Sequence, residues 1–82
     1  MPYIKKASRS RARFRPDNAG ELNYAITKLI DAYYHLPGNK NYQAINDIVG
    51  ALDGAKLEFY HRVARKYEDI KWSENGDVYR SK

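Results

Sequence analysis

Cysteine is absent from this 82-residue chain, and its absence excludes disulfide bonds, thiolate catalysis and cysteine-based zinc sites. Long apolar runs are absent too, because no segment approaches the roughly 20 residues that a membrane-spanning helix needs. Met1 is not followed by an apolar secretory segment. We therefore expect a cytoplasmic protein, in the host cytoplasm if the chain is viral, with no membrane partner.

Catalytic and metal-binding patterns are equally scarce. The two histidines, His35 and His61, stand far apart in the sequence and form no metal-ligand motif. The chain has neither a glycine-rich phosphate-binding loop nor the turn that carries a nucleophilic serine. The sequence thus predicts a protein that is not an enzyme and that holds no metal and no cofactor.

The composition is that of one small folded domain, with 43% hydrophobic and 30% charged residues. Its net charge of +5 is concentrated at one end. Residues 1–16 hold six basic side chains and no acidic one, whereas residues 17–82 hold nine basic and ten acidic side chains. We therefore divide the chain into a basic arm and linker at 1–18 and a helical hairpin domain with a C-terminal tail at 19–82.

The arm carries a cation at every second residue from Arg9 to Arg15, a period that predicts an extended segment and fits no helical stripe. Lysine and arginine neutralise phosphates, and Phe14 and Tyr3 can stack on exposed bases. The predicted site for nucleic acid or another polyanion is therefore Lys5, Lys6, Arg9, Arg11, Arg13, Phe14 and Arg15. A solvated tail and docking onto an acidic protein are the alternatives.

Two helices are predicted after the arm. Apolar residues recur at helical spacing from Leu22 to Leu36, with Asn18 as the cap and Glu21 three residues later. A second apolar stripe starts near Asn41 and runs to Ile70. The expected fold is therefore an all-α helical hairpin with a short first and a long second helix.

The second helix, at about 42 Å, is much longer than the first, at about 24 Å. An antiparallel hairpin leaves the second half of the longer helix uncovered, so we expect self-association, most simply as a four-helix bundle. Gly50 and Gly54 in this helix indicate close approach of another helix, or else a bend. The predicted oligomer interface is Gly50, Gly54, Phe59, Tyr60, Val63 and Tyr67. In the alternative, the arm or the tail folds back over this surface.

Two further patterns lie toward the C-terminus. Asn75-Gly76 predicts a two-residue hairpin turn that pairs Trp72 with Tyr79, or else an ordinary turn. Basic side chains also gather on the second half of the long helix. These residues are Arg62, Arg65 and Lys66. If they meet a second copy of the chain together with Tyr60 or Tyr67, they form an alternative anion pocket that holds a nucleotide.

Several segments, in this order and spacing, resemble an uncharacterised family of short helical proteins found in phage and bacterial genomes. They are Pro2-Tyr3-Ile4, Gly20-Glu21-Leu22-Asn23-Tyr24, Ile45-Asn46-Asp47-Ile48-Val49-Gly50-Ala51-Leu52, Lys56-Leu57-Glu58-Phe59-Tyr60 with Arg62-Val63, Tyr67-Glu68-Asp69 and Glu74-Asn75-Gly76-Asp77-Val78. The resemblance covers most of residues 20–79 and implies a viral or mobile-element setting without implying an activity. The basic 7–15 stretch departs from the family, whose members have a longer, acidic helical region there.

The leading interpretation is a phage-type binding protein that self-associates and contacts RNA or DNA through its arginine-rich arm. The alternative is a phage accessory protein that inhibits a host protein or sequesters a nucleotide signal between helices.

Overall fold

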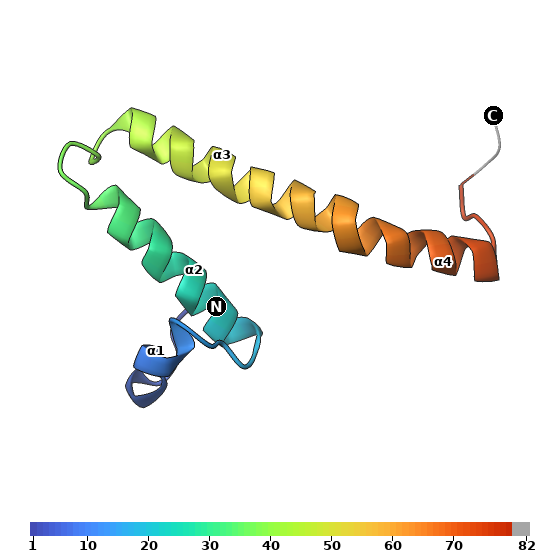
Figure 1. Ribbon diagram of the computed structural model, residues 1–82, viewed down its shortest axis with the longest axis horizontal. Coiled ribbons are helices and arrows are strands. Elements are labelled where there is room, and N and C mark those ends of the chain that lie inside the picture. Colours follow the sequence, from blue (N-terminus) through green and yellow to red (C-terminus); the bar gives the residue numbers. More distant parts are fainter. Residues whose placement is uncertain (80–82) are drawn as a thin grey trace. The chain divides into compact units, whose positions relative to one another are not determined.

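The computed structural model describes residues 1–79, in which every regular element is a helix. The elements are α1 (Lys6–Ala12), α2 (Ala19–Tyr34), α3 (Tyr42–Phe59), η1 (Tyr60–Ala64), which is a π-helical turn, and α4 (Arg65–Asn75) (Figure 1). The predicted all-α class is therefore confirmed. The chain divides into two compact units, residues 1–48 and the residues from Val49 onward, and each is described by itself.

Helix α2 begins where its capping residues predict. Asn18 has an extended backbone, and its side-chain oxygen accepts the Glu21 backbone N–H at 2.9 Å, which satisfies one of the free donors of the first turn. Gly38 in the following loop has φ +85°, a conformation that glycine adopts without strain. Asn41 then accepts the Ala44 N–H at 2.8 Å and caps α3. The predicted starts of both helices and the loop between them are thus confirmed, whereas the second helical stretch continues to Asn75 and does not end at Ile70.

The arm is helical, so the predicted extended conformation is wrong. Helix α1 covers most of the segment in which cations alternate, and Ala12 at its end is fully buried. Lysine, alanine and arginine rank among the strongest helix formers, and α1 contacts α2. A period of two favours a strand only where a neighbouring strand pairs with it. In the described residues no such strand exists.

The long helix passes through both central glycines without a break. Gly50 and Gly54 lie inside α3, and no atom lies within 4 Å of a Cβ placed on either of them in the single chain. The irregularity lies further on, at η1, where the Arg65 N–H bonds to the Tyr60 carbonyl five residues earlier. A bend or break at the glycines is therefore wrong, and the helix accommodates one extra residue in a π turn instead.

The predicted C-terminal hairpin is also wrong. Helix α4 continues to Asn75, and Gly76, with φ +87°, donates its N–H to the Trp72 carbonyl at 2.8 Å. The Asn-Gly pair therefore ends a helix, which is the other common use of a positive-φ glycine. Beyond it, Asp77 accepts the Tyr79 N–H at 3.0 Å in a local turn. Residues 80–82 of the predicted tail lie outside the described residues.

Little apolar surface is buried within the single chain. Over residues 1–79, the buried hydrophobic residues are Ala12 and Ala44, and no large side chain is fully buried. A helix that presents an apolar stripe derives most of its stability from packing that stripe against something else. The apolar side chains along α3, η1 and α4 are mostly exposed in the single chain, so this packing contribution is missing there.

No helix within residues 1–79 is both long enough and apolar enough to cross a membrane.

Candidate nucleic-acid interface

The arm is attached to α2 by one ion pair, between Arg11 and Glu21. The two guanidinium Nη atoms of Arg11 each donate to one carboxylate oxygen of Glu21, at 2.7 Å in both cases. Glu21 is only 7% exposed, so this bidentate pair is shielded from water on its acidic side. Such forked contacts fix both distance and orientation.

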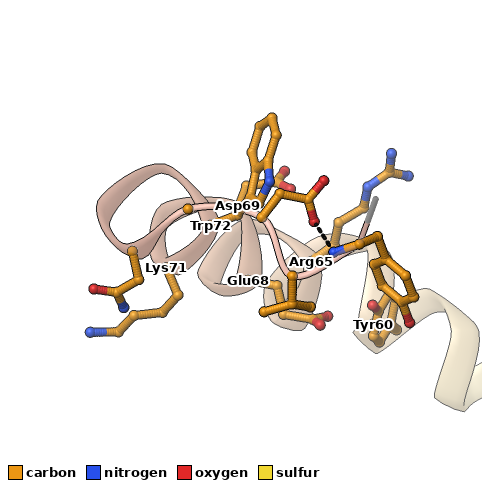
Figure 2. Close-up of a pocket in the computed structure, with 11 residues that line it drawn as sticks. Tyr60, Arg65, Glu68, Asp69, Lys71 and Trp72 are labelled. Atoms are coloured by element: carbon orange, nitrogen blue, oxygen red, sulfur yellow. Dashed lines mark hydrogen bonds between the residues drawn. The ribbon is translucent and has the colours of Figure 1, made fainter. Parts of the chain in front are cut away.

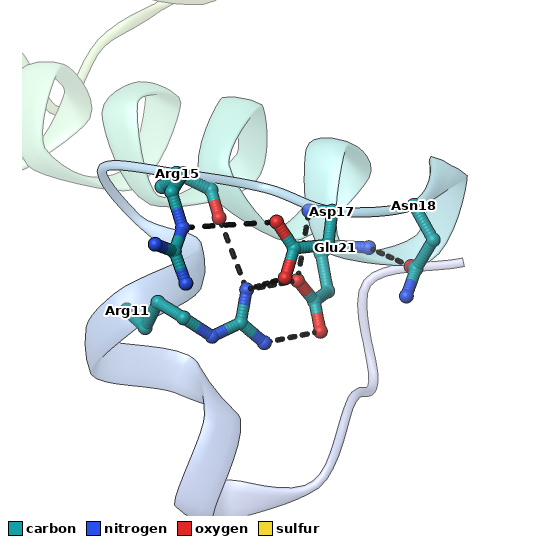
Figure 3. Close-up of polar contacts among 5 residues, drawn as sticks. All are labelled: Arg11, Arg15, Asp17, Asn18 and Glu21. Carbon is teal, nitrogen blue, oxygen red and sulfur yellow. Dashed lines mark hydrogen bonds and ion pairs between the residues drawn. The ribbon is translucent and has the colours of Figure 1, made fainter.

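Neighbouring groups complete this ion pair (Figure 3). Arg11 also donates to Asp17 at 2.8 Å and to the Arg15 carbonyl at 3.0 Å. The Asp17 backbone N–H donates to Glu21 at 3.0 Å. We call Arg11, Asp17 and Glu21 the clasp. Because each member touches both of the others, the clasp holds the C-terminal end of α1 against the start of α2.

The clasp shifts the pKa values of its main pair in opposite directions. The hydrogen bonds from Arg11, followed by the backbone bond from Asp17, lower the pKa of Glu21 to about 2 from its ordinary 4.5. The hydrogen bond with Glu21 raises the pKa of Arg11 in turn. Both side chains are therefore ionised throughout the physiological range.

Arg11 differs from the other cations of the predicted polyanion site in its role. Its guanidinium contacts two carboxylates of its own chain, so it acts as part of the scaffold. Binding a phosphate with Arg11 would require breaking the clasp.

Two cations of α1 and the cation at its C-cap share one face. Lys6, Arg9 and the C-cap residue Arg13, whose backbone is still helical, follow one another at three and four residues and therefore lie on one side. Arg9 is held in place, because its Nε donates to the Ile4 carbonyl at 3.2 Å and its guanidinium lies 5.6 Å from the centre of the Tyr24 ring. Lys6 and Arg13 are exposed, and Lys5 stands exposed just before the helix. We call Lys6, Arg9 and Arg13 the basic face.

The segment after α1 adds one further cation and an aromatic ring. Arg15 lies 3.7 Å from Asp17, and both side chains are largely exposed. Phe14, between Arg13 and Arg15 in the chain, is 86% exposed, and Tyr3, which precedes α1 in the chain, is 78% exposed. The predicted polyanion residues thus share one region of the molecule, with Arg11 as its support.

Acidification is expected to open the clasp. Because the folded-state pKa of Glu21 lies below its ordinary value, its contribution to stability is complete above about pH 4.5 and is lost as the pH falls toward 2. Thermal unfolding, followed by circular dichroism, measures this in the native chain and in Glu21→Gln. The native chain should melt at the higher temperature at pH 7, and the difference should vanish near pH 2. A difference that does not change with pH would contradict the role of the clasp.

The second unit contains an open cavity of about 580 Å³ beside α4 (Figure 2). Of the alternative anion pocket, only Arg65 lines it, together with Tyr60, Trp72 and the carboxylates Glu68, Asp69 and Asp77. Arg62 is paired instead with Glu58 at 3.0 Å. The pKa of Tyr60 is raised, and the main cause is a hydrogen bond with Glu68. Lys71 lines the cavity as well, and three carboxylates against these two cations leave the lining net negative, which disfavours an anionic nucleotide here.

Sequence reasoning missed both the clasp and this cavity. The Arg11–Glu21 pair of the clasp joins residues ten positions apart on different helices, and its one local signal is the acid Glu21 in the first turn of α2, three residues after the cap Asn18. The cavity forms because the residues after Gly76 turn back beside α4, and no sequence signal encodes that direction. Across residues 1–79, no group of three histidine or acidic side chains is placed to hold a metal ion.

The family model described as "Domain of unknown function (DUF6899)" matches residues 1–78. No curated protein and no solved structure matches the chain.

Proposed function

The chain belongs to this family of unknown function, and from its own residues we propose that it is a non-enzymatic protein that self-associates and binds RNA or DNA through its arm. A phage-type setting in the cytoplasm is part of this proposal and rests on the sequence alone. The observation that carries nucleic-acid binding is the basic face, in which Lys6 and Arg13 are exposed and Arg9 is half-buried, while the clasp holds α1 on α2.

The charge of the region supports a phosphate partner. Lys6, Arg9 and Arg13 lie along about 10 Å of helix, and Lys5 and Arg15 flank them at either end. Arginine suits phosphate geometry because its planar fork donates two parallel hydrogen bonds. A cluster of this kind needs no base contacts, so we expect it to bind RNA and DNA of unrelated sequence alike.

Self-association is supported by the exposed apolar side chains of the second unit. Phe59, Val63 and Tyr67 are each more than half exposed in the single chain, and Tyr60 is 43% exposed. Large contiguous apolar patches on soluble proteins usually mark interaction surfaces. We propose that α2 and α3 pair as a helical hairpin and that two copies join in a bundle, with Gly50 and Gly54 allowing close helix approach.

A salt titration tests nucleic-acid binding. With Arg11 held in the clasp, at most five arm cations are free to neutralise phosphates. The slope of log K against log salt should therefore lie between zero and about −4.5 for a duplex, at about −0.9 for each phosphate. Fluorescence anisotropy with unrelated RNA and DNA oligomers measures the slope.

Binding that is absent even at about 50 mM salt would overturn the proposal. Deletion of residues 2–15 is a poor test, because it also removes the partner of Glu21 and leaves that carboxylate unpaired on α2. Substitutions that neutralise the basic face leave the clasp in place and are the better choice.

A further inference from the structure

We propose that the arm prefers single-stranded over double-stranded nucleic acid, because an exposed aromatic ring, Phe14, directly follows Arg13 of the basic face along the chain. This inference rests on the proposed function and names the class of nucleic acid that the same site takes.

Phe14 is held in position by the backbone around it. Its N–H donates to the Arg11 carbonyl at 3.0 Å, and the Arg15 N–H donates to the same carbonyl at 2.8 Å. The Arg11 side chain is meanwhile bound to Glu21. Arg11 therefore fixes the turn around Phe14 through its carbonyl and is itself fixed to α2 through its side chain. The Phe14 ring thus projects from an ordered segment of backbone.

The ring is nevertheless left in water. Phe14 is 86% exposed, although its neighbours Ala12 and Pro16 are buried and half-buried. Burying a phenylalanine side chain typically contributes favourably to folding, and this chain forgoes that contribution at a position between Arg13 and Arg15. An exposed ring between cations is the arrangement that binds a base by its face while phosphates pair with the charges on either side.

A single strand makes use of both features, whereas a duplex uses only one. Bases in a single strand expose their faces, and stacking on an aromatic side chain contributes about 5- to 150-fold in affinity for each base. In an undistorted duplex those faces are stacked on neighbouring bases, so only the cations contribute. A backbone already ordered around Phe14 also loses little conformational entropy on binding. We therefore expect tighter binding of a single strand, despite its lower charge density.

The test compares a single strand and a duplex of equal length at one salt concentration, with the native chain and Phe14→Ala. The substitution should weaken single-strand binding by about 5- to 150-fold and duplex binding by less than about twofold. Phe14→Tyr should retain the affinity, because it retains the ring. The matched control is Tyr42→Ala, which removes an aromatic ring that is 76% exposed outside the arm and should leave both affinities unchanged.

A spectroscopic reading separates stacking from a change of fold. Trp72 is the one tryptophan in the chain, so Phe14→Trp in a Trp72→Phe background places a single fluorophore at the site. Single strands should quench this fluorescence and duplexes should not. Circular dichroism of Phe14→Ala should match that of the native chain, because an exposed ring supports no packing.

The outcomes distinguish the inference from the proposed function. Equal losses on single strand and duplex would point to a ring wedged between base pairs and would overturn the single-strand preference. Tighter duplex binding that does not depend on Phe14 would overturn it too, and in both cases nucleic-acid binding would stand. Absence of binding to either form would overturn the proposed function itself.

Discussion

Replacing the basic face with glutamine, as Lys6→Gln, Arg9→Gln and Arg13→Gln together, is expected to weaken binding to RNA and DNA by about a thousandfold at about 50 mM salt. Each phosphate contact contributes a slope of about −0.7 to −0.9 in log K against log salt, so losing three contacts removes a slope of roughly two to three. Extrapolated from about 1 M to about 50 mM salt, that difference amounts to about three powers of ten. Anisotropy titrations at several salt concentrations measure both quantities.

The matched control makes the same change in net charge at another place. Arg62→Gln, Arg65→Gln and Lys66→Gln together also remove three cations, and they cover the alternative anion pocket. We expect nucleic-acid affinity to change by less than about fivefold, because only the general electrostatic attraction is reduced. If both triple variants lost affinity equally, net charge rather than the basic face would account for binding. If only the control variant lost it, the site would lie on the second unit.

The second large effect concerns self-association. Phe59→Ala combined with Val63→Ala is expected to weaken association by a hundredfold or more. Removing a buried phenylalanine ring costs about 3 to 5 kcal/mol, and each factor of ten in affinity corresponds to about 1.4 kcal/mol. In a two-fold assembly the substitution acts on both copies. Multi-angle light scattering and sedimentation equilibrium at micromolar concentrations measure the effect.

Val78→Ala is the control, because Val78 is 92% exposed beyond the end of α4 and lies outside the proposed interface. It should associate as the native chain does. The double variant should also lose helical circular dichroism, since its long apolar stripe then lacks a partner surface. A native chain that stays monomeric at about 100 μM would refute self-association and would favour another partner for this surface.

Most of the fold can be predicted from local chemistry. The caps Asn18 and Asn41 act within three residues of themselves, and the Pro-Gly loop acts on its immediate neighbours. Apolar spacing identifies α2 and α3 because amphipathicity is a property of each helix alone. These features need no knowledge of the rest of the chain, so the sequence is sufficient for them.

The errors arise where two local signals compete. Alternating cations suggest a strand in the arm, yet the same residues are strong helix formers, and contact with α2 favours the helix. Asn75-Gly76 suits a hairpin turn and a helix end equally well, and the helix end prevails because α4 is already formed up to that point. At Gly50 and Gly54 the helix continues, because its neighbours on both sides favour it and glycine costs only about 1 kcal/mol.

The sequence by itself determined the helical class, the positions of the capped helix ends, the concentration of positive charge before residue 17 and the long apolar stripe. Only the tertiary structure decided that Arg11 is the arm cation held by two carboxylates and that Phe14 is exposed to solvent. The physical reason is the range of the interactions. Capping and periodicity act over one or two turns, whereas the pairing of Arg11 with Glu21 exists only when two separate helices meet.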